Sequence, residues 1–285
     1  QFEVGRMPAV RGTIRQLIYD GLPIGEVTFS TSRIRNGLRF DWLDVNGAHF
    51  QVHLTGAWKE TLLGETTTVD ITASSRDTGR ALRDLGYAVV IRDGVMQASA
   101  KLSWPGSPLA FDAAKLKGSM HLNIQKGAFT EVDAGAGRLL GLFSLNALPR
   151  RLTLDFRDAF KEGFSFDELN GDFRLVNGNS MTDNLTIKSP AAVVTITGRV
   201  GLVARDFDEV MTVVPQFGGS LPVAGGLVFG LEVGAAILLL DQLLGKEINK
   251  AGTKQYTITG SWDDPKITPI KKEPAPDRFE EEDGT

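Results

Sequence analysis

Apolar and polar residues alternate along most of this chain, and this period of two residues constrains the fold more than any other feature. Near residue 52, for example, Phe50, Val52 and Leu54 alternate with Gln51 and His53. Successive side chains of a β-strand point to opposite faces, so each such segment predicts a strand that is apolar on one face only. About a dozen segments follow the pattern, which predicts a mainly β fold made of one long, curved antiparallel sheet.

The apolar residues of these strands are expected to gather on one face of the sheet. Few helices are predicted to cover that face, so it must close on itself, pack on a second sheet, or hold an apolar ligand. The third outcome is an open apolar groove, a shape called a β-taco, which would bind phospholipid acyl chains. The candidate groove residues are Val52, Leu54, Val69, Ile71, Leu102, Leu122, Ile124, Leu152, Leu154, Phe156, Val194, Ile196, Val200 and Ile258.

Three segments have helical spacing instead. Residues 75–86 predict a short helix with Ser75 as N-cap and Gly86 as the C-terminal stop. Residues 137–148 predict a second helix, and residues 221–248 predict a long, apolar, glycine-rich one. We therefore expect a groove segment over residues 1–130, a C-terminal segment over 131–270 that holds the last two helices, and a disordered tail over 271–285.

The segment 221–244 could pack against another apolar surface. Gly226, Gly230 and Gly234 fall four residues apart, a spacing that lets a second helix approach closely. Glu232 and Asp241 interrupt the apolar run. Three interpretations stay open: a helix buried against the sheet, a membrane-interacting helix or hairpin, and a transmembrane span. The candidate membrane or helix-packing residues are Gly226, Gly230, Gly234, Leu227, Leu231, Ile237, Leu238, Leu240 and Leu244.

Side chains that carry catalytic or metal chemistry are sparse. The chain has no cysteine, which removes thiolate nucleophiles and disulfides. His49 and His53 lie four apart on a predicted strand, too far apart for a chelating pair. The glycines at 135, 137 and 141 lack the spacing and the βαβ context of a dinucleotide-binding loop. Since the net charge is −4, nucleic-acid binding is disfavoured as well. We expect no enzyme, no cofactor and no metal.

Longer strings of residues between about positions 102 and 267 resemble the C-terminal region of YhdP-type AsmA-like envelope proteins. The strings are Leu102-Ser103-Trp104-Pro105-Gly106, Gly135-Ala136-Gly137-Arg138-Leu139-Leu140-Gly141, Leu148-Pro149-Arg150-Arg151-Leu152-Thr153-Leu154-Asp155-Phe156, Gly163-Phe164-Ser165-Phe166-Asp167, Leu169-Asn170-Gly171-Asp172-Phe173, Thr182-Asp183-Asn184-Leu185 and Gly260-Ser261-Trp262-Asp263-Asp264-Pro265. Before residue 102 the likeness is mainly one of pattern.

The resemblance implies a long protein of the Gram-negative periplasm, anchored to the inner membrane by a segment absent from this chain. Its implied role is to move phospholipid between the inner and outer membranes and so to maintain the outer-membrane barrier. It carries over no catalytic residues. Two other hypotheses stay open: a structural cap that contacts a membrane or an envelope protein without carrying lipid, and an enzyme of lipid or glycan metabolism.

Overall fold

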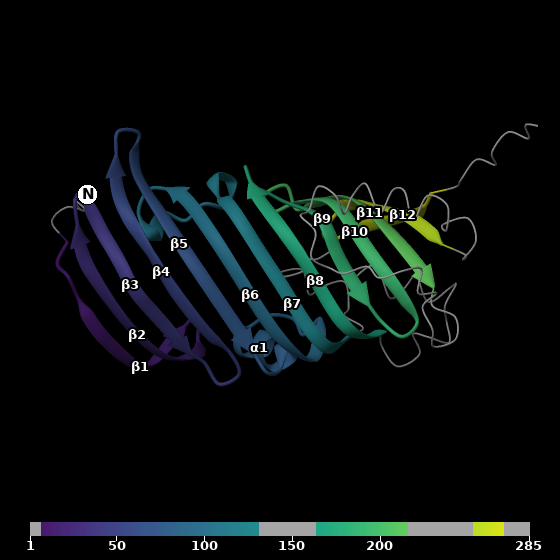
Figure 1. Ribbon diagram of the computed structural model, residues 1–285, viewed down its shortest axis with the longest axis horizontal. Helices are drawn as coiled ribbons and strands as arrows, with labels where there is room; N and C mark the ends of the chain where they lie inside the picture. The colour runs from purple at the N-terminus through teal and green to yellow at the C-terminus, as the bar shows by residue number, and fades with distance from the viewer. Residues whose placement is uncertain (1–6, 131–163, 216–252, 271–285) are drawn as a thin grey trace, which may run out of the picture.

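The protein forms a single antiparallel sheet in which each strand pairs with the next strand in the chain. The computed structural model describes residues 7–130, 164–215 and 253–270. These hold a 13-stranded sheet whose spatial order is the sequence order, from β1 at one edge to β13 at the other (Figure 1). The strands are β1 (Arg11–Tyr19), β2 (Leu22–Ile34), β3 (Gly37–Asn46), β4 (Gln51–Thr61), β5 (Gly64–Ser75), β6 (Ile91–Pro105), β7 (Lys117–Phe129), β8 (Phe164–Val176), β9 (Asn179–Lys188), β10 (Ala192–Gly201), β11 (Asp206–Pro215), β12 (Lys254–Ser261) and β13 (Pro265–Pro269). The predicted mainly β, antiparallel fold is confirmed.

Tight turns between strands use the residues that hairpin geometry requires. Asp20 and Gly21 join β1 to β2, and both have positive φ angles, of 50° and 77°. Asn177 and Gly178 join β8 to β9 with φ angles of 49° and 74°. Two successive left-handed residues match the twist of the flanking strands, which is why Asp-Gly and Asn-Gly pairs favour such turns.

One short helix, α1 (Thr78–Asp84), follows β5, within the range 75–86 that the sequence predicts. Its N-cap is Asp77, whose carboxylate accepts a hydrogen bond from the backbone N–H of Arg80. The predicted N-cap, Ser75, is instead the last residue of β5, and it donates its hydroxyl to the carbonyl oxygen of His49 at 2.6 Å. This prediction was wrong because pairing with β6 extends β5 to Ser75. Gly86, with φ of 77°, follows the helix as predicted.

Helix α1 packs on the apolar side of the sheet. It contacts both β2 and β6, although β3, β4 and β5 lie between those two strands. On a flat sheet, four strand spacings would separate β2 from β6 by about 19 Å. A seven-residue helix is about 10 Å long, so α1 reaches both strands either by lying across the strand direction or because the sheet curves towards it. Leu82 of α1 packs against the apolar cluster that includes Leu122 and Ile124, which places α1 on the apolar side of the sheet.

Two further short elements follow β6, the 3-10 turns η2 (Pro108–Ala110) and η3 (Ala113–Lys115). The predicted helices at 137–148 and 221–248 and the predicted tail at 271–285 lie outside the described residues. No helix in the described parts of the chain is both long enough and apolar enough to cross a bilayer.

Candidate functional site

Apolar side chains form continuous rows across the strands of one face. Neighbouring strands pair Leu43 with Leu54, Leu54 with Ile71, Ile71 with Ala100, and Ala100 with Met120. These five residues form a row from β3 to β7, perpendicular to the hydrogen-bonded strands. All five are partly exposed to solvent. An uninterrupted apolar row that solvent reaches is what an acyl chain lying across the strands requires.

A second row runs beside the first and has small side chains at its centre. It consists of Val45, Val52, Ala73, Ala98 and Leu122, each opposite the next on the neighbouring strand. The first four are partly exposed, and only Leu122, 5% exposed, is buried. Alanine on β5 and β6 leaves room above the sheet where valine, leucine or isoleucine would fill it. We call the surface made by these two rows, from β3 to β7, the apolar face.

The same side of the sheet is closed over its C-terminal strands. The apolar side chains on the same side of β8 to β12 belong to one buried cluster, in which Leu169, Ile187, Ile196 and Ile258 are each 0% exposed. Aromatic rings pack in this cluster where β7 ends and β8 begins, with the ring centroids of Phe129 and Phe164 5.9 Å apart in a stacked arrangement. The apolar side is therefore buried throughout β8–β12, whereas nine of the ten residues in the two rows of β3–β7 are partly exposed.

The predicted groove residues differ in exposure, and three of the buried ones, Val69, Leu122 and Ile124, lie on β5 and β7. Val52, Leu54, Ile71 and Leu102 are partly exposed on the N-terminal strands. The buried ones, at 0–6% exposure, are Val69, Leu122, Ile124, Val194, Ile196, Val200 and Ile258. Outside the described residues lie Leu152, Leu154 and Phe156, together with the candidates of the glycine-rich segment, Gly226, Gly230, Gly234, Leu227, Leu231, Ile237, Leu238, Leu240 and Leu244.

Sequence reasoning left several members of the apolar face out of the candidate set. Leu43, Ala73, Ala98, Ala100 and Met120 all lie in its two rows. The alternation around Ala98, Ala100 and Met120 marks them as inward-facing, but alanine contributes little to an apolar pattern. Leu43 follows a register shift between β3 and β4, and that shift breaks the simple alternation.

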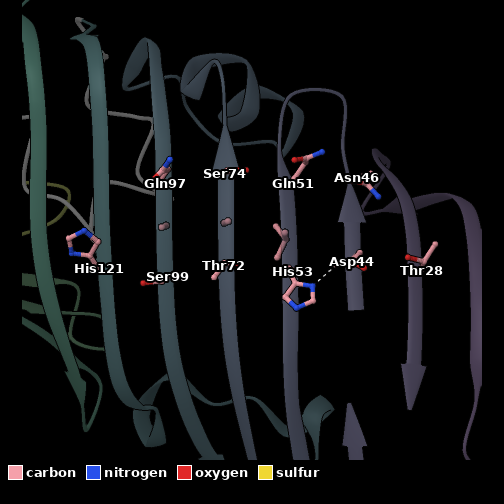
Figure 2. Close-up of a pocket in the computed structure, with 13 residues that line it drawn as sticks. Thr28, Asp44, Asn46, Gln51, His53, Thr72, Ser74, Gln97, Ser99 and His121 are labelled. Carbon is pink, nitrogen blue, oxygen red and sulfur yellow. Dashed lines mark hydrogen bonds and ion pairs between the residues drawn. The ribbon is translucent and has the colours of Figure 1, made fainter. Parts of the chain in front are cut away.

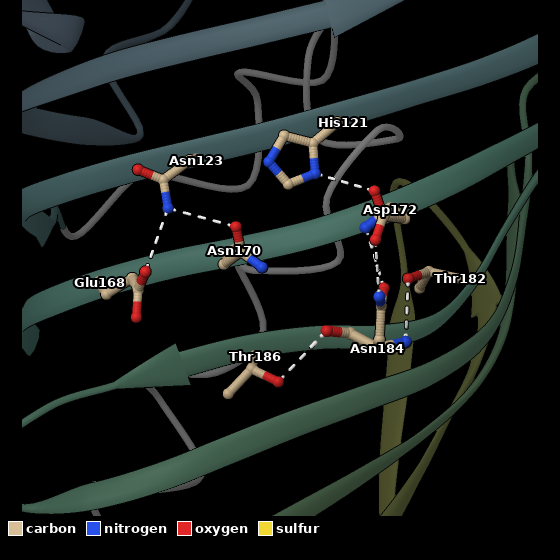
Figure 3. A network of polar contacts seen from close by, with 8 residues as sticks. All are labelled: His121, Asn123, Glu168, Asn170, Asp172, Thr182, Asn184 and Thr186. Carbon is tan, nitrogen blue, oxygen red and sulfur yellow. Dashed lines mark hydrogen bonds and ion pairs between the residues drawn. The ribbon is translucent and has the colours of Figure 1, made fainter. Parts of the chain in front are cut away.

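The opposite face carries a row of polar side chains across eleven strands, all of them neutral except Glu26. Cross-strand pairing aligns Glu26, Asn46, Gln51, Ser74, Gln97, Asn123, Asn170, Thr186, Thr195, Thr212 and Gln255. Figure 3 shows Asn123 donating to Asn170 at 3.2 Å and to Glu168 at 3.2 Å. Hydrogen bonds between neighbouring side chains of this row stabilise the pairing of adjacent strands. This face is suited to water, and we name it the polar face.

Two histidine–aspartate pairs lie on the polar face. His53 contacts Asp44 at 2.6 Å (Figure 2), and His121 contacts Asp172 at 2.8 Å (Figure 3). Partial burial raises the pKa of Asp172, but hydrogen bonds with Asn184 and His121 outweigh it, and the pKa lies below its ordinary value. Within the described ranges neither imidazole hydrogen-bonds a serine or threonine hydroxyl, so neither pair is joined to a nucleophile.

A pocket of about 640 Å³ lies over these polar strands, lined by residues from β2 to β7 that include Thr28, Gln51, Thr72, Ser99 and His121 (Figure 2). Ten of the thirteen lining residues point from the polar face, and the lining offers amide and hydroxyl groups rather than a continuous apolar wall. It does not match an acyl chain. Among residues 7–130, 164–215 and 253–270, no group of three histidine or carboxylate side chains is placed to hold a metal ion.

The fold and its two unlike faces define a class: a single-layer, curved antiparallel sheet that is apolar on one side and polar on the other. The sequence comparisons place the chain more narrowly. The model of the YhdP protein family matches residues 1–267, so the chain belongs to the YhdP family. It is 32% identical over 220 residues to the "Intermembrane phospholipid transporter YhdP" of Escherichia coli (strain K12), covering 77% of this chain and 17% of that protein. The chain thus spans about a sixth of the length of that relative. No solved structure matches it.

Proposed function

We propose that the apolar face of β3–β7 is a groove that holds phospholipid acyl chains, as one part of a periplasmic conduit between the inner and outer membranes. The observation that carries the proposal is the pair of partly exposed apolar rows, unbroken over five strands. The relative described as an intermembrane phospholipid transporter supports the same ligand and the same compartment. In this function the conduit supplies the outer membrane with phospholipid and so maintains its barrier.

Binding by such a face has the properties that transport needs. Each methylene removed from water contributes about 0.8 kcal/mol, and the contribution does not depend on direction. The rows cross five strands, which span about 19 Å at the usual strand spacing. No single contact fixes the position of a chain along the row, so an acyl chain can slide from strand to strand. Head groups remain at the solvent side and contribute little selectivity.

A second candidate role concerns the C-terminal strands. The apolar side chains of β8–β12 that point to the apolar side of the sheet are buried, exemplified by Leu185 at 1% and Val194 at 1% exposure. This closure favours a cap that ends the conduit and docks it to a membrane or to an envelope protein. Docking through the predicted apolar segment 221–244 is part of this alternative.

We also propose that the chain is not an enzyme. In support, the exposed His53–Asp44 and His121–Asp172 pairs stand on an open face, where water competes with any reacting group. Loss of lipid movement after changing one of these polar residues, with the fold intact, would overturn this part.

The groove proposal is tested by two substitutions at adjacent positions. Ile71 lies on the apolar face and its neighbour Thr72 on the polar face, so Ile71→Asp and Thr72→Asp add the same charge to opposite sides of β5. The chain is purified from a bacterial periplasm and examined by native mass spectrometry with lipid extraction. We expect phospholipid on the wild type and on Thr72→Asp, and its loss from Ile71→Asp with an unchanged circular dichroism spectrum. A well-folded wild type that carries no lipid would reject the groove and leave the cap.

A further inference from the structure

The turn between β4 and β5 exposes two leucines completely. Leu62 and Leu63 are 106% and 101% exposed, as accessible as in an extended peptide. They form the tip of a hairpin whose last paired residues are Thr61 and Gly64. Figure 1 shows this hairpin projecting beyond the ends of the neighbouring strands. Nothing in the described part of the protein covers either side chain.

Hairpin geometry does not call for leucine at this tip. The turns after β1 and β8 place Asp-Gly and Asn-Gly at the corresponding positions. Here the left-handed conformation falls on Gly64, with φ of 104°. The Thr61 hydroxyl holds the turn, since it donates to the carbonyl of Gly64 at 2.7 Å and accepts from the N–H of Leu63 at 3.2 Å. The leucine side chains are thus dispensable to the turn and are presented to whatever lies beyond it.

More exposed apolar side chains lie on the same rim of the sheet. The connection after β6 carries Leu109, 99% exposed, and Phe111, 55% exposed. The N–H of Gly106 donates to the carbonyl of Glu65 at 2.7 Å, which joins that connection to the base of the β4–β5 hairpin. Leu62, Leu63, Leu109 and Phe111 therefore form an apolar rim, a name used below for these four residues.

The charges beside the tip are mainly positive. The turn between β2 and β3 lies next to the end of β4, because the N–H of Glu60 donates to the carbonyl of Asn36 at 2.8 Å. Arg33, Arg35 and Lys59 are exposed in this region, against the carboxylates Glu60 and Glu65. These three cations and two carboxylates sum to +1, on a chain whose net charge is −4. Apolar tips flanked by cations are suited to the surface of a membrane that contains anionic lipid.

We propose that the apolar rim inserts into the interface of a phospholipid bilayer and holds this side of the sheet against the membrane. A narrow projection with two bare leucines needs no preformed pocket in a bilayer, whereas a protein partner would have to supply one. The insertion places the ends of β5 and β6 next to lipid, and Leu102, partly exposed on the apolar side, lies near the end of β6 at Pro105. Acyl chains then have a short path from the bilayer onto the apolar face. This docking goes beyond the proposed conduit, and either can fail without the other.

A dye at the tip tests the insertion directly. The chain has no cysteine, so Leu63→Cys gives a unique site for an environment-sensitive nitrobenzoxadiazole label. The matched control is Ile18→Cys, an apolar residue 62% exposed at the opposite ends of the strands. With vesicles of phosphatidylethanolamine and phosphatidylglycerol, we expect a blue shift and brighter emission at position 63 and neither at position 18. No response at position 63, or equal responses at both, would overturn the proposal.

Two further measurements test whether the fluorescence response at position 63 depends on the apolar rim and on lipid. In the labelled Leu63→Cys chain, Leu62→Asn together with Leu109→Asn should raise the vesicle concentration for a half-maximal response at least about tenfold, because it removes two apolar side chains from the contact. An unchanged midpoint contradicts the role of the rim. A blue shift that grows with protein concentration in the absence of vesicles would show a second copy as the occupant and reject the bilayer. If the wild type carries lipid but position 63 does not respond, only the docking fails.

Discussion

Replacing an isoleucine by alanine at two positions of the same apolar side tests whether that side is open on β5 and closed on β10. Ile196 is 0% exposed and lies between Leu185 and Met211 on the flanking strands. Ile196→Ala removes three buried carbons, about 2.4 kcal/mol of transfer free energy, and leaves a cavity that raises the total to about 3–4 kcal/mol. Ile71 is partly exposed, so solvent enters the space that Ile71→Ala creates, and we expect a loss of only about 1 kcal/mol.

The two losses are compared by urea unfolding, followed by hydrogen exchange with mass spectrometry of peptides from β5 and from β10. Reading each strand separately avoids the assumption that so long a sheet unfolds in one step. The amount of bound phospholipid should rank the two variants in the opposite order to their loss of stability. Ile71→Ala should reduce bound lipid, and Ile196→Ala should not. Equal losses of stability at the two positions would refute the distinction between an accessible and a dry half, and with it the position of the groove.

Two other predictions concern the C-terminal strands. Gly198→Ala should destabilise the β10–β11 pair by about 2 kcal/mol or more in thermal unfolding, because φ is 133° and a Cβ would lie 2.4 Å from the carbonyl oxygen of Asp208. The control is Gly21→Ala, which has φ of 77° and no atom within 4 Å of the added Cβ, and which should cost only about 1 kcal/mol. The paired hydrogen bonds from Arg199, at 2.9 and 3.0 Å, hold the pKa of Asp206 below 3.8. A carboxyl group whose pKa is lowered in the folded state contributes stability at neutral pH, and this stability disappears as the pH falls through that pKa. Arg199→Gln should therefore flatten the drop in unfolding free energy below about pH 4. An unchanged dependence of the unfolding free energy on pH in this range would contradict this role.

Alternation along the chain was enough to predict the strands and the inward residues of each. Val52 and Leu54 illustrate this, since a period of two settles which side of a strand they occupy. The rows themselves were not predictable, because register between strands depends on turns and bulges rather than on local pattern. Leu43 joins its row only through a register shift, and Asn123 meets Asn170 across a connection of more than thirty residues in which nothing local indicates the pairing.

The degree of burial of each side chain on the apolar side also could not be predicted from the sequence. Ile71 and Ile196 occur in equally apolar, equally alternating segments, yet one is partly exposed and the other is not exposed at all. The difference comes from tertiary packing, since Ile196 belongs to a buried cluster that draws residues from β6 to β13. By contrast, Leu62 and Leu63 carried a local signal, because leucines stand where hairpin turns favour asparagine, aspartate and glycine.

The sequential strand order has a consequence for how the protein folds and how such a sheet changes in length. Every strand in the described parts of the chain pairs only with its neighbours in sequence, so stability approximates a sum of nearest-neighbour terms. Folding can therefore start at any hairpin and spread outward, and it is slowed mainly where β7 must find β8 and where β11 must find β12 across long connections. Pairing between sequential strands also makes the sheet modular, because inserting one hairpin lengthens it by about 9–10 Å without disturbing the register elsewhere.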